Sequence, residues 1–353
     1  MDEKIVRRKK KSKKKTKKWQ VAAVVILSLL LVGLVGSYAV FNSYFSLIKK
    51  APDAGEMTLE ERLSANADDP VPTPMPLAPG EVTPPPAATP GPGVTAEKEK
   101  EIYNLLFMGI DNREDAYTRR NDATLMVTVN KRDKKITATS FIRDGRIWMP
   151  GWGYQKLNVA NVYGGPQLVI DTIEYNYGVK ADNYLMINFF AFQEVVDAMG
   201  GVRVQLTDDE VNHINGHVPD SPPLTYTADG YYNLDGAQAL MFCRDRYVGS
   251  DIERTARQRR MLGAALEKVK TLSLTEISNV AKIGLNHTIS DIDQGTFLSL
   301  VALAPSLKSY TFEHGAIPID GTWQFENIGG GSYITFDLDA NREYLQKIFY
   351  GLE

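Results

Sequence analysis

The sequence predicts a mixed α/β (α+β) domain in which helices flank a mixed central β-sheet, preceded by one N-terminal transmembrane helix and a proline-rich linker. Three observations support this prediction: residues 21–41 carry no charge, eleven of the 18 prolines fall within 51–98, and strand and helix patterns alternate from residue 102 onward. The predicted organisation is a basic cytoplasmic tail over 1–18, a transmembrane helix over 19–41, an extracellular linker over 42–98, a principal folded domain over 99–270, and helices and strands over 271–353 that complete the outer domain.

The N-terminal segment combines a cationic tail with an apolar stretch. Residues 1–18 contain eleven lysines and arginines against two acidic residues, whereas the whole chain has a net charge of -3. Because an apolar stretch of membrane-spanning length follows, we interpret the tail as a topology signal and expect no nucleic-acid partner. The positive-inside rule then places everything after Phe41 outside the cell. A cleaved signal peptide with a small-residue site at 37–39 is the alternative, but the apolar run is longer than such peptides usually have.

The linker is expected to be an extended tether, because it is rich in proline and poor in large apolar residues. At roughly 3 Å per extended residue it would reach on the order of 100 Å from the membrane. The outer domain therefore need not contact the bilayer. The single cysteine, Cys243, excludes a disulfide within the chain, so the domain must be stabilised by its core.

Strand and helix patterns alternate through the outer domain. Short apolar runs bounded by polar residues predict strands that are covered on both faces, and the polar residues 131–135 predict a hairpin between two of them. Helices are predicted where apolar positions recur at helical spacing and glycine closes the segment. The predicted strands are 102–111, 123–130, 135–143, 182–189, 202–206, 310–319 and 333–338; the predicted helices are 165–178, 189–201, 236–244, 251–270, 275–285, 295–307 and 341–352.

A dense run of charge, RDRYVGSDIERTARQRR, occupies residues 244–260. Ser250 and Glu253 have the spacing of a capping box, which predicts a helix that starts at Asp251. Apolar residues follow at helical spacing and predict a face turned toward the core. They are Met261, Leu262, Ala265, Leu266 and Val269.

The first two turns of that helix have an unusual charge pattern. Cations at a helix N-terminus oppose the macrodipole, so a helix selected only for stability would carry acids there. A bound anion would relieve the repulsion among the arginines that precede the helix and occupy its first two turns, and guanidinium groups beside a helix N-terminus are suited to phosphate. Residues at spacings of three and four are expected to share one face: Asp251, Arg254, Arg257 and Gln258. The alternative is a solvated charged face, to which we assign Arg259 and Arg260.

Polar residues also end several predicted strands. Asp111 closes one strand and Asp122 opens the next, so the two carboxylates would repel unless a cation joined them, and hard oxygen ligands suit Mg²⁺. The alternative is a pair of turn aspartates. Arg143 and Asp144 follow a third strand, and Lys156 and Asn158 are either ligands or turn residues. A zinc site at His213 and His217 is disfavoured, because Gly216 is expected to break the helix and no third ligand accompanies them; we expect surface histidines.

The order of these motifs resembles that of the LytR-CpsA-Psr family over about residues 103–270. The matching motifs are Gly109-x-Asp111-x-Arg113, Arg120-x-Asp122, Arg143-Asp144, Lys156-Leu157-Asn158, Tyr163-Gly164-Gly165-Pro166, VVDAMGGVRV, LDGAQAL, Arg244-x-Arg246, and D-x-x-R-x-x-R-Q from Asp251. The basic tail, single span and linker also fit the family's layout. One departure is the short loop between Arg246 and Asp251, which bears on the mouth of the site and the choice of acceptor.

The resemblance implies that residues 99–270 are the catalytic domain of a membrane-anchored, Mg²⁺-dependent phosphotransferase outside Gram-positive-type cells, with Mn²⁺ as a substitute metal. It would move a glycopolymer phosphate, of the teichoic-acid or capsule kind, from an undecaprenyl-pyrophosphate carrier to a peptidoglycan sugar hydroxyl, with the polyprenyl tail in an apolar tunnel. The alternatives are a non-catalytic wall-binding or regulatory protein of the same fold and a hydrolase of lipid-linked pyrophosphates.

The resemblance also implies residue roles. Asp111 and Asp122 would hold the metal, and Asp251 would be the base that activates the acceptor, with Arg244 and Arg246 beside it in the catalytic set. The implied pyrophosphate-binding residues are Arg120, Arg143, Arg244, Arg246, Arg254 and Gln258, with Lys156, Arg257 and Arg113 as further members.

Overall fold

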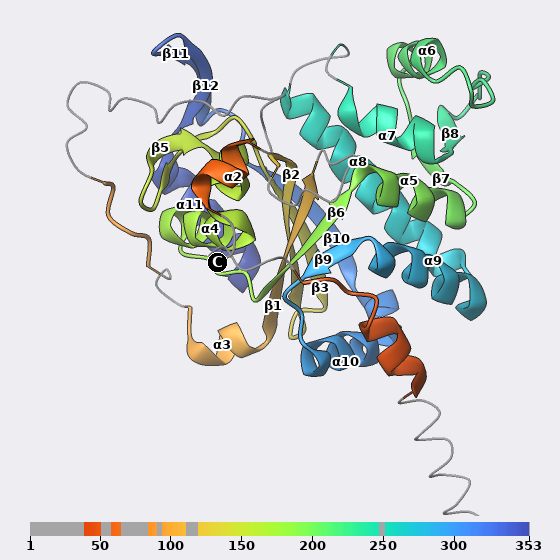
Figure 1. Ribbon diagram of the computed structural model, residues 1–353, viewed down its shortest axis with the longest axis horizontal. Coiled ribbons are helices and arrows are strands. Elements are labelled where there is room, and N and C mark those ends of the chain that lie inside the picture. Colours follow the sequence, from red (N-terminus) through yellow and green to blue (C-terminus); the bar gives the residue numbers. More distant parts are fainter. Residues whose placement is uncertain are drawn as a thin grey trace, which may run out of the picture. The chain divides into compact units, whose positions relative to one another are not determined.

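The computed structural model describes residues 39–50, 58–64, 84–89, 94–110, 119–245, 247 and 251–352 (Figure 1). The chain divides into two units, Met1–Ser46 and Leu47–Glu353. In the first unit, residues 39–45 are helical, and the rings of Phe41 and Phe45 stack with centroids 6.4 Å apart. Most of the predicted transmembrane helix lies outside the described residues, and none of the helices within them has the length and apolar character needed to cross a membrane.

A six-stranded mixed sheet forms the centre of the second unit, in the order β10-β3-β2-β1-β6-β9. β1 pairs antiparallel with β2 and parallel with β6, β3 pairs antiparallel with β2 and parallel with β10, and β9 pairs antiparallel with β6. The strands are β1 (Ile102–Ile110), β2 (Asn121–Asn130), β3 (Lys135–Phe141), β6 (Asn183–Asn188), β9 (Thr288–Ser290) and β10 (Thr311–Ile317). Fully and partly buried residues alternate along β1 and none is exposed, which confirms that both faces of this strand are covered.

Helices cover both faces of the sheet, as predicted (Figure 1). On one face lie α4 (Ala160–Tyr177) and α11 (Leu338–Tyr350); on the other lie α5 (Phe189–Ala198), α7 (Gly236–Arg244), α8 (Asp251–Thr271) and α9 (Leu274–Asn286). The first group packs on a core that includes Leu106, Ile173 and Phe349. The second group builds another core, which includes Val196 and Phe242. α4 ends where expected, because Gly178 adopts the left-handed conformation with φ 67°.

Several short elements follow no pattern strong enough to predict from sequence. They are α2 (Leu59–Ser64), α3 (Ala96–Lys100), β4 (Arg146–Met149), β5 (Gly153–Lys156), η1 (Leu157–Val159), α6 (Asp208–His217), β8 (Tyr231–Leu234), β9 (Thr288–Ser290), η2 (Ala304–Ser309) and β11 (Trp323–Ile328). The predicted strand 202–206, observed as β7 (Val202–Gln205), pairs with β8 in a separate two-stranded sheet rather than in the central one. Likewise β11 pairs with β12 (Gly331–Phe336), and β4 pairs with β5.

From Lys49 onward, the described parts of the predicted linker lie against the folded domain instead of forming an extended spacer. Lys49 pairs with Ile289 of β9, and α2 packs on α4 with Arg62 only 4% exposed. The Ala88 amide donates to the Tyr175 carbonyl at 2.8 Å, and the Tyr175 hydroxyl donates to the Pro85 carbonyl at 2.7 Å. Proline lacks a donor but keeps its carbonyl acceptor, so a proline-rich segment can still be held by donors on the domain.

Candidate functional site

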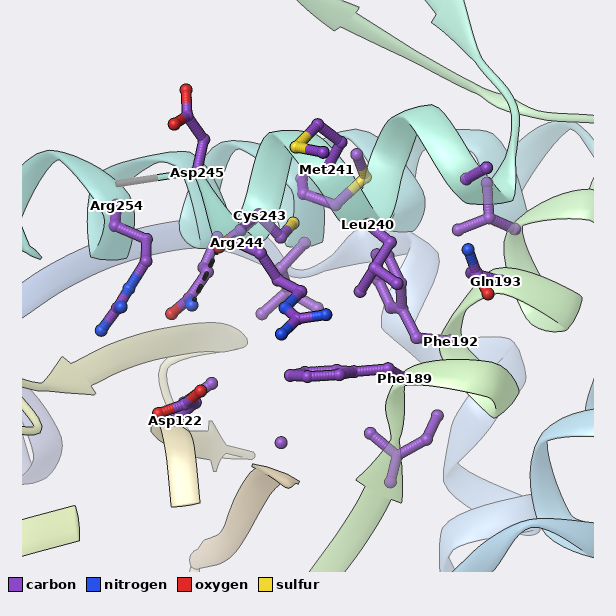
Figure 2. Close-up of a pocket in the computed structure, with 18 of the residues that line it drawn as sticks. Asp122, Phe189, Phe192, Gln193, Leu240, Met241, Cys243, Arg244, Asp245 and Arg254 are labelled. Carbon is purple, nitrogen blue, oxygen red and sulfur yellow. Dashed lines mark hydrogen bonds between the residues drawn. The ribbon is translucent and has the colours of Figure 1, made fainter. Parts of the chain in front are cut away.

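A cavity of about 900 Å³ lies between the central sheet and the helices on one of its faces. This volume is near the upper end of the range for small-molecule sites, roughly 300–1,000 Å³. The wall is mostly apolar and combines residues of β1, β6, α5, α7 and α8 (Figure 2). Apolar wall residues include Phe107, Leu125, Ile187, Phe189, Phe192, Val195, Val196, Met199, Leu240, Met241, Met261, Leu262 and Ala265.

Polar side chains gather at one part of this wall. Arg244 ends α7, Arg254 and Gln258 lie one turn apart on α8, and Asp122 lies on β2. Figure 2 shows the Arg244 and Arg254 side chains extending from α7 and α8 toward the side of the cavity that holds Asp122. The guanidinium of Arg244 lies over the Phe189 ring, 4.2 Å from its centroid. Arg254 is 2% exposed, so its positive charge is held away from bulk water.

Asp122 belongs to a chain of ion pairs that continues beyond the cavity. Its Oδ1 accepts a hydrogen bond from Arg143 at 2.7 Å. Arg143 also contacts Asp144 at 3.3 Å, and Asp144 pairs with Lys156 at 2.8 Å. All four side chains are largely buried, with exposed fractions between 12% and 23%, so the network fixes the direction of the Asp122 carboxylate.

The residues predicted to form one charged face of α8 have two different roles in the structure. Arg254 and Gln258 line the cavity, whereas Arg257 turns to the C-terminal end of α7. There Arg257 donates to the carbonyls of Phe242 and Asp245, which the end of a helix leaves without intrahelical partners. This buried arginine therefore holds α7 against α8, and with it the position of Arg244.

Arg259 and Arg260 are not a solvated face, contrary to our expectation. Arg260 donates to both carboxylate oxygens of Glu210, each at 2.7 Å, and its guanidinium lies 4.9 Å from the centroid of the Phe242 ring. Burial lowers the pKa of Arg259 below its usual value, with Asp320 acting in the opposite direction. Arg260 therefore links α8 to α6, whereas Arg259 is largely removed from water within reach of the charge of Asp320.

The expectation of surface histidines in α6 is confirmed for His217, which is exposed, but is wrong for His213 and for the helix break at Gly216. Gly216 does not break the helix, which continues to His217 and starts with a capping box between Thr207 and Glu210. His213 is not a surface residue: its side chain is 12% exposed, and its Nε2 lies 3.2 Å from Oδ1 of Asp245. The rings of His213 and His217 stack with centroids 4.0 Å apart, and both line the cavity.

Cys243 lines the cavity next to Arg244. Burial raises the pKa of its thiol to about 12, while Arg257 and Arg260 act in the opposite direction. The thiol is therefore protonated at neutral pH and is a poor nucleophile.

The structure brings four of the sequence-predicted residues to one cavity: Asp122, Arg244, Arg254 and Gln258. Arg143 and Lys156 lie in the ion-pair network behind Asp122. Arg120 interacts with Tyr163 of α4, where its charge opposes the upward shift that burial produces in the Tyr163 pKa, and it is not among the cavity-lining residues. Asp111, Arg113 and Arg246 lie outside the described residues, and Asp251 is the first residue of α8 as predicted, with its side chain not described.

Sequence reasoning missed Phe189 and Asp245 as site residues. Phe189 directly follows β6, where functional residues are common, but the sequence patterns placed it only at the junction of a predicted strand and a predicted helix. Asp245 lies between the two arginines of the R-x-R motif, and no local pattern connects it to a histidine 32 positions earlier. Only the packing of α6 beside α7 brings them together.

The donor set is compatible with a hard divalent cation. Mg²⁺ is commonly bound by one or two carboxylates together with substrate phosphates and water, rather than by a cage of protein ligands. Asp122 supplies one carboxylate, and its bond to Arg143 uses Oδ1. Within the described residues, no cluster of three or more His, Cys, Asp or Glu side chains is placed to hold a metal ion.

Comparison with known proteins gave consistent matches. The model of the LytR_cpsA_psr family matches residues 82–347. Polyisoprenyl-teichoic acid--peptidoglycan teichoic acid transferase TagU of Enterococcus faecalis is 37% identical over 195 residues, which are 52% of this chain and 58% of that protein. Biofilm regulatory protein A of Streptococcus mutans is 31% identical over 278 residues, 72% of this chain and 64% of that one. The chain thus spans less than two thirds of the length of these relatives.

A solved structure described as TagT bound to LI-WTA has a similar fold. It superimposes with a TM-score of 0.60 at 25% identity, covering 74% of this chain and 94% of that one. The two chains therefore share the same mixed α/β architecture.

Proposed function

This chain belongs to the LytR-CpsA-Psr family, and from that premise we propose that it is a membrane-anchored transferase that moves a glycopolymer phosphate from an undecaprenyl-pyrophosphate carrier to a sugar hydroxyl of peptidoglycan. The name of the Enterococcus faecalis relative favours a teichoic acid as the polymer, and a capsule polymer has the same linkage chemistry. One observation carries the proposal: a single cavity joins a long apolar wall to a cluster of arginines.

The apolar wall suits the polyprenyl tail of the carrier. Aliphatic and aromatic side chains of α5, α7, α8 and the sheet line it, so the tail would be removed from water along much of its length. The stripe Met261, Leu262 and Ala265, predicted as core-facing, forms part of this wall. A glycopolymer donor substrate without a long lipid tail would leave these apolar side chains exposed to water, which favours a lipid-linked substrate.

Arg244, Arg254 and Gln258 suit the pyrophosphate. Arginine guanidinium groups donate several directed hydrogen bonds to phosphate oxygens, and charges act more strongly in a site from which water is excluded. Arg254 is already buried, and Arg257 and Phe189 fix the position of Arg244, so little reorganisation accompanies binding. Arg143 is a positioning residue that orients Asp122; Arg246, Arg120, Lys156 and Arg113 complete the proposed set.

The reaction is a phosphoryl transfer. The oxygen of the acceptor hydroxyl forms a bond to the phosphorus that carries the glycopolymer, and the bridging P–O bond to the lipid-linked phosphate breaks. The proton of the hydroxyl passes to the carboxylate of Asp251, and the carrier leaves as polyprenyl monophosphate. Asp251 begins α8 one turn before Arg254, so the base and the phosphate-binding arginine come from the same helix end.

Asp122 and Asp111 would hold Mg²⁺, or Mn²⁺ in its place. Ile110, the last residue of β1, pairs with Asn121, which directly precedes Asp122. Asp111 follows Ile110 in the chain, and consecutive Cα atoms are about 3.8 Å apart, so chain connectivity keeps the Cα atom of Asp111 close to this pair. When bound, the ion would neutralise negative charge on the phosphates.

We place the N-terminal tail in the cytoplasm, one span over 19–41 in the membrane, and the catalytic domain outside a Gram-positive-type cell. The uncharged stretch 21–41 and the cationic residues before it support this topology.

The test incubates the full chain in detergent micelles with a polyprenyl-pyrophosphate-linked oligosaccharide, Mg²⁺ and peptidoglycan oligomers, followed by mass spectrometry of the products. We expect a phosphodiester-linked conjugate. The rate of its formation should fall at least a hundredfold in Arg244→Gln and in Asp122→Asn, since both substitutions remove charge at the reacting phosphates. Arg203→Gln is the matched control, because Arg203 is an exposed arginine on β7 paired with Asp229. Glycan phosphate released without acceptor would indicate the hydrolase, and lipid binding without any product would indicate a regulatory protein; either result would overturn the proposal.

A further inference from the structure

Asp245 places a carboxylate directly beside an arginine assigned to the pyrophosphate. It follows Arg244, forms the C-terminal cap of α7 and is one of the residues that line the cavity. Its side chain is 4% exposed, so water screens its charge only weakly. A carboxylate binds a guanidinium group in the same bidentate geometry as a phosphate does. Asp245 is therefore a potential competitor of the substrate for Arg244.

Adjacent arginine and aspartate side chains pair readily in this chain. Two Arg-Asp steps form ion pairs between neighbouring side chains, with nitrogen–oxygen distances of 2.9 and 3.3 Å: Arg132–Asp133 and Arg143–Asp144. The third Arg-Asp step of the sequence, at residues 244–245, has a different geometry. Figure 2 shows the Asp245 side chain pointing away from the side of the cavity toward which Arg244 extends. Its surroundings must therefore hold this carboxylate in another direction.

Two donors contact the Asp245 carboxylate on the side where it points. Its Oδ1 accepts from the Tyr247 amide at 2.7 Å, which is a turn in which an aspartate side chain binds the backbone two residues further on. Nε2 of His213 lies 3.2 Å from the same oxygen. Nε2 must carry the hydrogen of this contact, because an ionised carboxylate only accepts. The first donor is local, whereas the second comes from α6, which packs beside α7.

The imidazole of His213 is itself held in place. The His217 ring stacks on it with centroids 4.0 Å apart, and the centroid of the Tyr247 ring lies 5.7 Å away. The ion pair between Arg260 and Glu210 links α6 to α8. Because the imidazole is already fixed, holding the carboxylate costs little further side-chain entropy.

We propose that His213 is a positioning residue, which keeps the Asp245 carboxylate from competing with the substrate pyrophosphate for Arg244. The inference rests on the pyrophosphate site of the proposed function. The carboxylate shapes the turn after α7 through the Tyr247 amide, and His213 offsets the competition that this carboxylate would otherwise cause. Loss of the imidazole would let the carboxylate turn toward its neighbouring arginine, as happens in the other two Arg-Asp steps.

The test is a double-mutant cycle on the full chain in detergent micelles, in which isothermal titration calorimetry measures the affinity for farnesyl pyrophosphate in the presence of Mg²⁺. His213→Leu should lower this affinity about tenfold, because the released carboxylate pairs with Arg244. Asp245→Asn should change it less than about threefold, since the amide oxygen still accepts from both donors. In the His213→Leu background, Asp245→Asn should instead raise the affinity about tenfold, because it removes the competitor.

Controls separate this role from general packing. His213→Gln, whose side-chain amide can donate in place of Nε2, should keep the affinity within about threefold of the wild type. His287→Leu disrupts another His–carboxylate contact, 3.0 Å from Glu194 and outside the cavity lining, and should change the affinity less than about twofold. The affinity for farnesol, which has no phosphate, should change less than about twofold in every variant.

The outcomes distinguish this inference from the proposed function. No loss in His213→Leu, a loss that persists in the double variant, or an equal loss for farnesol would overturn the inference. An equal gain from Asp245→Asn in both backgrounds would also overturn it, because it would show an effect of charge without competition. If the wild-type chain bound farnesyl pyrophosphate no more tightly than farnesol, the proposed pyrophosphate site would fail, and this inference with it.

Discussion

Phe189→Leu tests whether the aromatic ring under Arg244 prepares the site for pyrophosphate. The ring lies flat beneath the guanidinium, 4.2 Å from ring centroid to Cζ (Figure 2). Leucine keeps an apolar side chain in the cavity wall but removes the π face. The substitution should therefore free Arg244 to adopt other rotamers while leaving the lipid-binding wall almost intact.

The expected magnitude follows from the geometry and burial. A cation–π contact contributes about 0.5–1 kcal/mol at exposed sites and about 2 kcal/mol when it is desolvated. Phe189 is half-buried, which places the contribution near 1 kcal/mol, or about a fivefold weaker affinity for a ligand that depends on Arg244. The affinity for a ligand without phosphate should fall less than twofold, because only a small apolar area changes.

The assay is isothermal titration calorimetry with farnesyl pyrophosphate and, separately, farnesol, both in the presence of Mg²⁺. Phe192→Leu is the matched control, since Phe192 lines the same wall and, within the described part of the chain, makes no cation–π contact. We expect Phe192→Leu to lower the affinity for the two ligands by the same factor. Equal losses for both ligands in Phe189→Leu, or no loss for either, would refute the role assigned to the ring.

Two further predictions concern stability and cysteine chemistry. Glu210→Ala should lower the free energy of unfolding by about 2–3 kcal/mol in urea titrations, because it removes both the acceptor of the Thr207 amide in the capping box and the partner of Arg260. The lower part of the range for a broken buried pair applies, because Arg260 is partly exposed. Cys243 should react with iodoacetamide about a thousandfold more slowly at pH 8 in the folded protein than after unfolding, because its pKa of about 12 leaves little thiolate; the rate should still be rising at pH 10.

Each of these predictions has a control within the chain. Asp209→Ala changes an exposed acid in the same helical turn and should cost less than about 0.5 kcal/mol; a cost equal to that of Glu210→Ala would show that only the negative charge at the helix start matters. For Cys243, the urea-unfolded chain provides the reference thiol. A labelling rate in the folded protein that levels off below pH 9 would contradict the raised pKa.

Patterns of neighbouring residues were enough to predict the elements that depend on local physics. The capping spacing of Ser250 and Glu253 placed the start of α8 at Asp251, and a glycine that tolerates positive φ placed the end of α4 at Gly178. The buried strands β1, β2, β3 and β6 were found because residues covered on both faces form continuous apolar runs. The ordered motifs were also enough to indicate the family that the comparisons confirm.

The roles of individual arginines could not be predicted in the same way. Arg254, Arg257, Arg259 and Arg260 are chemically identical and lie within two turns, yet one lines the cavity, one holds the end of α7, one is buried near the charge of Asp320 and one links α8 to Glu210 of α6. Each step along a helix rotates the side chain by about 100°, so its role depends on which neighbour lies in that direction. The neighbours come from α6, α7 and the loop at Asp320, far away in sequence.

By itself, the sequence determined where this chain forms its longer strands and helices, where its charge and prolines gather, and which family it joins, because these features depend on residues close together in the chain. Tertiary structure decided that Asp122, Arg244, Arg254 and Gln258 share one cavity, that His213 meets Asp245, and that residues 47–50 return to the edge of the sheet. A cavity exists only where packed elements leave space between them, and a contact such as that between His213 and Asp245 exists only where two elements pack side by side. Both are properties of how distant segments meet, which no local pattern records.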